Sequence, residues 1–184
     1  MRFIATALPG VVVIEPAVYE QSCGYFFESY QRQKFAAAGI SVSFVQEYRS
    51  RSAQGTLRGL HYQLHRPQAR LYTALHGELF AVAIDVRKGS PSFGQSAGVL
   101  LSAANKQQLF VPRGFAHGLL VLSQKAEFMY KCDEFFYPQD ERGVLWSDPA
   151  LGIAWRIEEP VLSARDRCNL PLSRIDPLDL PTYP

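Results

Sequence analysis

Apolar and polar residues alternate over many short segments of the chain, as they do in β-strands. Residues 41–47, SVSFVQE, alternate with a period of two, which predicts a strand with one buried face. Residues 78–86, ELFAVAIDV, are apolar on both faces, which predicts a strand in the middle of a sheet. Further strands are predicted at residues 11–16, expected to be the first strand, and at residues 70–76, 96–101, 107–111, 118–123 and 126–132.

Turn-forming residues and one helical segment punctuate these strands. The KGSPSFG cluster at residues 88–94 predicts a turn, and Gly77 joins two strands. The last two strands are expected to form a hairpin around residues 124–125. Residues 28–38 are rich in Ala and Gln and predict a helix that stops at Gly39.

About eight to ten strands with two or three short helices predict an all-β fold, either a barrel or a two-sheet jelly roll. Beyond Trp155 the chain is rich in Pro, Asp and Arg, which predicts loops and helical turns packed over the barrel. No repeat or linker divides the chain. We therefore expect one domain over residues 1–184, with residues 170–184 as a C-terminal tail.

Composition narrows the class of protein. Apolar residues make up 47% and charged residues 20% of the chain, as in ordinary soluble proteins. A net charge of +2 makes no case for nucleic acid or a membrane surface, and no apolar run approaches a bilayer span. Pro9 and Gly10 interrupt the apolar N-terminus, which argues against a signal peptide. The three cysteines, Cys23, Cys132 and Cys168, lack metal-like spacing and predict free thiols in a reducing cytoplasm.

The segment LRGLHYQ at residues 57–63 is the first candidate for chemistry. If it is a strand, His61 and Gln63 share one face. Polar groups that point into a barrel are costly unless they meet a ligand or each other. The plainer interpretation is a core histidine satisfied by its neighbours.

The second candidate is His117, which follows a Pro-x-Gly turn at residues 112–114. This spacing resembles the second half of the cupin metal signature. The first half needs two closely spaced His and a Glu, whereas His61 and His65 are four residues apart with no Glu at the right distance. We therefore expect no metal cofactor, and a histidine at a strand edge is the simpler interpretation.

Two further residues are suited to proton transfer. Tyr130 shares a strand face with Cys132, so its phenol is either a proton donor or a core tyrosine with one hydrogen bond. Asp166 follows Ser163 at the spacing of a helix cap. Asp166 either completes that cap or reaches His61, which would fix the imidazole tautomer and raise its basicity.

Several segments in order resemble the dTDP-4-dehydrorhamnose 3,5-epimerase family: LRGLHYQ, VPRGFAHGLLVLS, YKC, LWSDPALGIAW and LSARD. The resemblance extends from about residue 12 to about residue 172. It implies a cupin-like jelly-roll barrel that uses no catalytic metal or other cofactor. It also implies a homodimer in which an N-terminal segment crosses to the neighbour. The implied substrate is a dTDP-linked 4-keto-6-deoxyhexose, inverted at C3 and C5 on the way to L-rhamnose-type sugars.

The resemblance also assigns roles to residues. It implies that His61 is the base, held by Asp166, and that Tyr130 is the acid. Arg70 stands where the family has a Lys that stabilises the enolate oxygen, and Arg58 is expected to bind the diphosphate. The other substrate-binding residues implied by the match are Gln46, Gln63, His117, Phe26 and Glu28.

The chain departs from the family pattern at several of these positions. Cys23 replaces an Arg that contacts diphosphate from the partner subunit, Tyr48 replaces an Asn, and residues 135–136 are Phe-Phe instead of Tyr-Tyr. These changes leave open a C3-only epimerase acting on a related nucleotide 4-keto sugar. Three more functions compete with these epimerase activities: a metal-dependent cupin enzyme, a non-catalytic sugar-nucleotide binding module and a 3,4-ketoisomerase.

Overall fold

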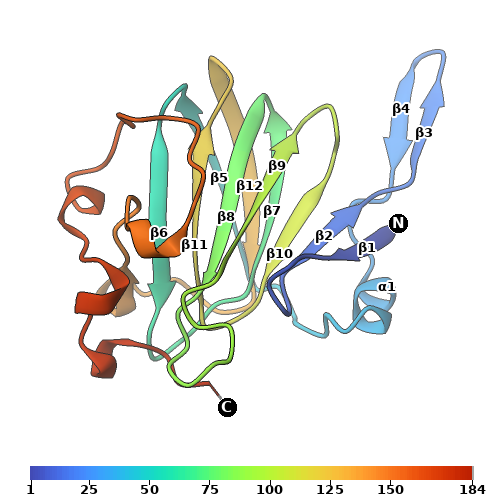
Figure 1. Cartoon of the computed structure of the whole chain (residues 1–184). Coiled ribbons are helices and arrows are strands. Elements are labelled where there is room, and N and C mark those ends of the chain that lie inside the picture. The colour runs from blue at the N-terminus through green and yellow to red at the C-terminus, as the bar shows by residue number, and fades with distance from the viewer. Residues whose placement is uncertain (184) are drawn as a thin grey trace.

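Two antiparallel β-sheets lie face to face and form the body of the protein (Figure 1). The structure is a computed structural model that describes residues 1–183. The larger sheet has the order β1 (Arg2–Ala5), β2 (Val12–Glu15), β10 (Gln108–Val111), β7 (Arg70–His76), β12 (Lys125–Cys132) and β5 (Gln46–Ala53). The smaller sheet has the order β13 (Glu141–Gly143), β6 (Leu57–Gln63), β11 (Phe115–Val121), β8 (Glu78–Asp85) and β9 (Ser96–Ser102). The predicted all-β jelly-roll class is confirmed.

The main core fills the space between the two sheets. Tyr72 and Phe128 from the larger sheet pack there with Ala83 and Leu119 from the smaller sheet. Burial of each large apolar side chain contributes about 1.5–3 kcal/mol, which stabilises the pairing of the sheets. The space between the sheets therefore holds a packed core that can fix the position of side chains nearby.

A second cluster covers the outer face of the smaller sheet. Val82 and Ile84 of β8 point into it, and Leu172 and Leu180 of the C-terminal tail pack against them. Strand β8 is therefore apolar on both faces because both are covered, and its predicted central position, between β11 and β9, is confirmed. The chain after β12 forms five short 3₁₀ turns within the described residues, drawn in orange to red in Figure 1: η1 (Pro138–Asp140), η2 (Pro149–Leu151), η3 (Asp166–Cys168), η4 (Leu172–Arg174) and η5 (Pro177–Asp179).

The helix α1 (Arg32–Ala37) is shorter than the predicted residues 28–38. Gln31 caps it by accepting a hydrogen bond from the Lys34 backbone N–H, and the chain leaves it at Gly39, whose φ is +84°. Its one buried residue, Phe35, packs edge-on against Phe3. The helix therefore packs against the larger sheet through Phe35 and covers part of it.

Two predictions about the strands are wrong. Residues 41–45 are not a strand, and β5 begins only at Gln46. The alternation in this segment arises because Val42 and Phe44 pack against the buried apolar cluster that contains Phe35 of α1. The strands on either side of residues 124–125 form no hairpin, because β11 pairs with β6 and β8 while β12 pairs with β5 and β7. The chain crosses from one sheet to the other at that point.

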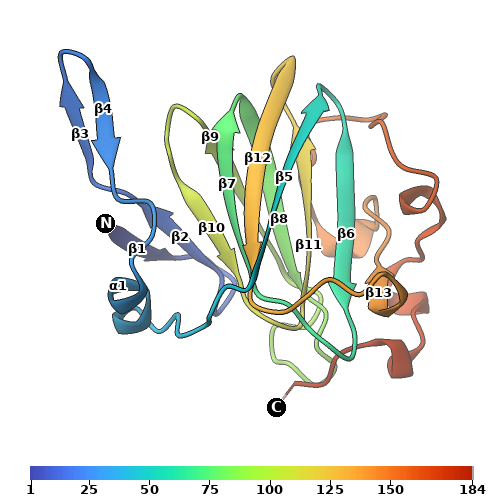
Figure 2. The same ribbon diagram turned by 180° about the vertical axis from the view of Figure 1, so that it is seen from behind.

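The N-terminal region holds strands that the pattern did not indicate. The strand β1 precedes the segment that was expected to be first, and pairs with it along its whole length. The strands β3 (Val18–Gln21) and β4 (Gly24–Phe27) form a hairpin that projects from the body of the protein (Figures 1 and 2). No helix within residues 1–183 has the length and apolar character needed to cross a membrane.

Candidate active site

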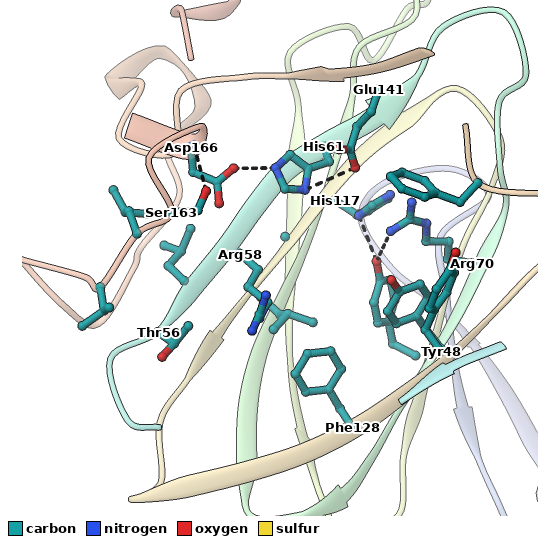
Figure 3. A pocket seen from close by; sticks show the side chains of 18 residues that line it. Tyr48, Thr56, Arg58, His61, Arg70, His117, Phe128, Glu141, Ser163 and Asp166 are labelled. Atoms are coloured by element: carbon teal, nitrogen blue, oxygen red, sulfur yellow. Dashed lines mark hydrogen bonds and ion pairs between the residues drawn. The ribbon is translucent and has the colours of Figure 1, made fainter. Parts of the chain in front are cut away.

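A pocket of about 440 Å³ lies between the two sheets, close to the loop that precedes η3 (Figure 3). Strands β5, β6, β7, β11 and β12 all contribute side chains to it. It brings together six of the residues expected in the site: Arg58, His61, Arg70, His117, Tyr130 and Asp166. The four others, Gln46, Gln63, Phe26 and Glu28, do not line it in the described part of this chain.

An irregularity in β6 places both Arg58 and His61 on the pocket. His117 pairs with His61 and Leu119 pairs with Arg58, so two steps along β11 match three steps along β6. This extra residue is a β-bulge, which resets the alternation of side chains. Gly59 lies in the bulge, where a Cβ would come within 2.6 Å of the His117 carbonyl oxygen. Simple alternation would have put Arg58 and His61 on opposite faces.

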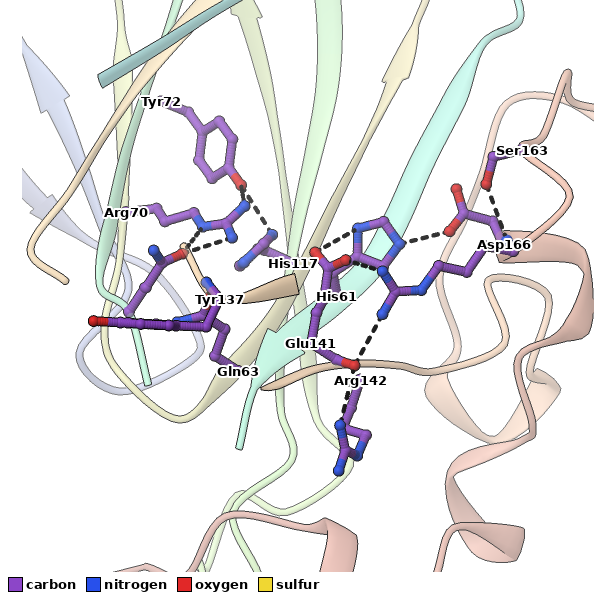
Figure 4. A network of polar contacts seen from close by, with 12 residues as sticks. His61, Gln63, Arg70, Tyr72, His117, Tyr137, Glu141, Arg142, Ser163 and Asp166 are labelled. Carbon is purple, nitrogen blue, oxygen red and sulfur yellow. Dashed lines mark hydrogen bonds and ion pairs between the residues drawn. The ribbon is translucent and has the colours of Figure 1, made fainter. Parts of the chain in front are cut away.

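His61 lies between two carboxylates (Figure 4). Its Nε2 is 2.5 Å from Oδ1 of Asp166, and its Nδ1 is 3.7 Å from Oε1 of Glu141. The Asp166 backbone N–H donates to the Ser163 hydroxyl at 3.0 Å, so the predicted cap and the predicted contact with His61 are both present. Burial by itself raises the pKa of Asp166, but its hydrogen bond to His61 and the imidazole charge lower the pKa overall. The carboxylate therefore stays ionised and fixes the imidazole.

Tyr130 lies in a row of aromatic side chains on the larger sheet, which faces the smaller sheet that carries His61. Its ring is 5.2 Å from that of Tyr72, whose hydroxyl is 2.9 Å from Nδ1 of His117. Burial raises the pKa of the Tyr130 phenol, against the opposing charge of Arg70. The phenol therefore holds its proton at neutral pH and is available as a donor.

Arg70 is a buried cation. It is only 6% exposed and has no ion pair within residues 1–183. Gln68 Oε1 accepts from its Nη2 at 2.7 Å and from its Nε at 3.1 Å. Burial of an unpaired charge is costly, so the position suits a group that gains negative charge in the pocket.

Arg58 occupies a more open part of the pocket. Its Nη2 and Nε donate to the Ser52 hydroxyl at 3.1 and 3.2 Å, and the side chain as a whole is exposed. Most of the guanidinium remains free to donate hydrogen bonds to a solvated anion such as a phosphate.

The expected residues outside the pocket have other contacts. Gln63 donates to the Arg66 carbonyl oxygen at 2.6 Å and accepts from the Tyr137 backbone N–H at 2.8 Å, which holds the loop after β12. Gln46 accepts from the backbone N–H of Phe136, a pocket residue, at 2.8 Å. Phe26 lies on β4 of the projecting hairpin and Glu28 directly follows it, and neither lines the pocket.

Three residues of the site escaped the sequence analysis: Glu141, Tyr72 and Gln68. Gln68 lies beside a candidate in sequence, two residues before Arg70, and that spacing was a usable signal. Glu141 is 80 residues from His61 in the chain, and only the pairing of β13 with β6 brings them together. Within residues 1–183, no three His, Cys, Asp or Glu side chains gather closely enough to hold a metal ion.

His117 makes the stability of the protein dependent on pH. Burial and the charges of Arg70 and His61 hold its pKa well below the ordinary value. The folded protein therefore keeps the ring neutral, whereas the unfolded chain binds a proton below about pH 6.5. Since the unfolded state binds more protons there, stability should fall on acidification by up to ~1.4 kcal/mol per pH unit for this group.

Denaturant unfolding at about pH 7.5 and about pH 5.5 measures this effect. The wild type should lose roughly 1 kcal/mol more than His117→Gln between these two values. Groups such as Asp166 titrate in both proteins and cancel in the comparison. An equal loss in both proteins would show that His117 is not the responsible group.

An imidazole held by a carboxylate, a protonated phenol and a buried guanidinium without an ion pair in the described residues surround one pocket in a jelly roll. Such groups are suited to acid–base chemistry, in which a proton is removed from and returned to a carbon next to a carbonyl group. The family model for dTDP-4-dehydrorhamnose 3,5-epimerase matches residues 5–174. The chain belongs to this family and is a carbohydrate epimerase of the isomerase class.

Individual relatives support the same assignment. The chain is 50% identical over 169 residues to dTDP-4-dehydrorhamnose 3,5-epimerase of Pseudomonas aeruginosa, covering 91% of this chain and 93% of that protein. It superposes with a TM-score of 0.96 and 44% identity on dTDP-6-deoxy-D-glucose-3,5-epimerase of Legionella pneumophila in complex with dTDP-4-keto-L-rhamnose, over 100% and 98% of the two chains. A 3′-monoepimerase from Streptomyces bikiniensis in complex with dTDP-quinovose is also similar, with a TM-score of 0.91 and 31% identity over 98% and 93%.

Proposed function

We propose that this protein inverts C3 and C5 of a dTDP-4-keto-6-deoxyhexose, in the formation of L-rhamnose-type sugars. The observation that carries the proposal is the His61–Asp166 pair in the same pocket as Tyr130 and Arg70. The 44% identity to a protein crystallised with dTDP-4-keto-L-rhamnose supports this choice of substrate. Incubation with dTDP-4-keto-6-deoxyglucose, followed by NMR of the product, tests it. Recovery of unchanged substrate would refute it.

The proposed chemistry is proton removal and return through an enolate. Asp166 accepts the hydrogen bond from Nε2 of His61, which leaves the Nδ1 lone pair to take the proton from the sugar carbon. The electron pair of the broken C–H bond moves onto the 4-keto oxygen, where the buried Arg70 offers positive charge. Tyr130 then returns a proton to the opposite face of the carbon, which completes the inversion.

A C3-only epimerase is the second candidate. The similarity to a 3′-monoepimerase at 31% identity favours it, as does the bulky Tyr48 beside Tyr130 in the pocket. The two reactions differ in whether C5 exchanges its proton with solvent. The position of deuterium in the product therefore separates them.

Arg58 is proposed to bind the diphosphate. A guanidinium–phosphate hydrogen bond contributes roughly 1.5–3 kcal/mol, and this contact exists in both ground and transition states. We expect Arg58→Ala to raise the apparent KM for the dTDP-sugar about ten- to a hundredfold, with a smaller effect on kcat. Steady-state kinetics measures both constants, with Arg58→Lys as the charge-conserving variant. An unchanged KM in Arg58→Ala would rule out this role.

We further propose a homodimer in which the β3–β4 hairpin reaches the partner's pocket. The hairpin projects from the body of the protein (Figure 2). It exposes Tyr19 (60%), Tyr25 (57%) and Phe26 (65%), which is a large apolar surface for such an element. In the dimer these rings would be covered, and Phe26 and Glu28 would join the partner's substrate site. The free thiols of Cys23 and Cys168 fit our proposal of a cytoplasmic location.

Mixed dimers test the exchange of hairpins. His61→Asn lacks the base, and Phe26→Ala combined with Glu28→Ala lacks the proposed hairpin contacts. A mixed dimer of the two contains one site with an intact base and an intact hairpin, so we expect activity to return on refolding the two variants together. Light scattering should give twice the chain mass. Activity that does not return, or a monomeric mass, would contradict the proposal.

A further inference from the structure

A row of three tyrosines crosses the larger sheet along the pocket. Tyr48 of β5, Tyr130 of β12 and Tyr72 of β7 are direct partners in the register of the three strands. The ring centroids are 5.3 Å apart for Tyr48 and Tyr130 and 5.2 Å apart for Tyr130 and Tyr72, with the ring planes 30° and 38° apart. The Tyr130 ring is therefore held between two other rings.

The two flanks of Tyr130 are built differently. Tyr72 is buried, and its hydroxyl is tied to His117 of the opposite sheet, so this flank is rigid. Tyr48 lies on β5, the last strand of its sheet, and its ring otherwise meets Phe136 edge-on at 6.4 Å. Since no further strand follows β5 within residues 1–183, Tyr48 is the register partner of Tyr130 on the outer flank, and its ring packs against the Tyr130 ring there.

We infer that Tyr48 is a positioning residue that holds the Tyr130 phenol in the orientation for proton return. The inference rests on the proposed function. A tyrosine side chain turns about two bonds, and a proton donor must lie within hydrogen-bond reach of the carbon it serves. The guanidinium of Arg70, 5.0 Å from the Tyr130 ring centroid, and the Tyr72 ring limit rotation from one side only. The Tyr48 ring closes the other side.

This role predicts a specific partition of the enolate. When Tyr130 is in place, the intermediate gains deuterium from D₂O on the opposite face and becomes inverted product. When Tyr130 is displaced, His61 returns a proton or deuteron to the original face, and the sugar carbon keeps its starting configuration. The ratio of inverted to retained deuterated sugar therefore reports the position of Tyr130, and it does not depend on how much of the enzyme is folded.

The experiment measures this ratio by NMR with dTDP-4-keto-6-deoxyglucose in D₂O. We expect Tyr48→Ala and Tyr48→Leu to lower it about two- to tenfold, as the loss of an aromatic pair implies. Tyr48→Phe keeps the aromatic ring, so this variant should retain the wild-type ratio of inverted to retained sugar. The matched control is Glu47→Gln, a neighbour on β5 whose carboxylate is paired with Lys131 outside the pocket. In a Tyr130→Phe background, Tyr48→Ala should change the ratio no further.

Two results would overturn the inference about Tyr48 alone, and a third would overturn the proposed function. If Tyr48→Ala and Tyr48→Leu slow exchange and inversion equally, the ratio stays constant and the inference is overturned. A change in ratio that persists in the Tyr130→Phe background would also overturn it, because Tyr48 would then act without Tyr130. A wild-type protein that incorporates no deuterium would overturn the proposed function, and this inference with it.

Discussion

Replacement of His61 by Asn is expected to slow deuterium exchange at the sugar carbons by about 10²–10⁴-fold, the usual effect of losing a general base. In the proposed mechanism His61 is the base, held by its hydrogen bond with Asp166, and Asn has no comparable basicity. Binding of dTDP should remain nearly intact, because we propose that the diphosphate is bound by Arg58 and not by His61. NMR in D₂O measures exchange, and calorimetry measures binding.

A neighbouring histidine provides the control for this prediction. His65 follows on the same segment but is exposed and lies outside the pocket, so His65→Asn should exchange at the wild-type rate. Wild-type exchange in His61→Asn would show that another group is the base. Glu141, 3.7 Å from the imidazole, would then be the next candidate.

Replacement of Tyr130 by Phe is expected to separate exchange from inversion. The variant keeps the ring between those of Tyr48 and Tyr72 but lacks the hydroxyl that we propose as the proton donor. Inversion should fall about 10²-fold or more, whereas exchange on the face of His61 should fall much less. The measurement is the rate of each process in the same D₂O sample.

Tyr137→Phe is the matched control, because it removes a hydroxyl that accepts from Arg66 outside the pocket. It should leave both rates unchanged. Tyr130→Phe that still epimerises at the wild-type rate would place the proton donor elsewhere, for example on a water molecule.

The pattern of the sequence predicted most strands but not how they pair. Period-two alternation and apolar runs located β7 and β8, because each strand buries one or both of its faces. The same alternation gave a wrong prediction at residues 41–45, where Val42 and Phe44 pack against the buried cluster that contains Phe35 of α1 without forming a strand. Consecutive strands such as β11 and β12 looked like a hairpin, yet they belong to different sheets. Sheet membership depends on contacts far apart in sequence, which local patterns do not record.

In the candidate site too, short motifs were predictable from the sequence, whereas contacts between distant segments were not. His61, Tyr130 and Asp166 were candidates because each lies in a distinctive short motif, and the fold brings all three to one pocket. The bulge at Gly59 was not predictable from alternation, and it decides that Arg58 also faces the pocket. Glu141 was missed because its only link to His61 is the pairing of β13 with β6. Side chains whose roles arise from packing alone carried no signal in the sequence.

The position of deuterium in the product is the sharpest test of proton removal and return at C3 and C5. The wild-type protein is incubated in D₂O with dTDP-4-keto-6-deoxyglucose, and NMR locates the label and the configuration at each carbon. We predict deuterium at both C3 and C5, both inverted, with incorporation slowed about 10²–10⁴-fold in His61→Asn. Product that carries no deuterium at either carbon would contradict this prediction.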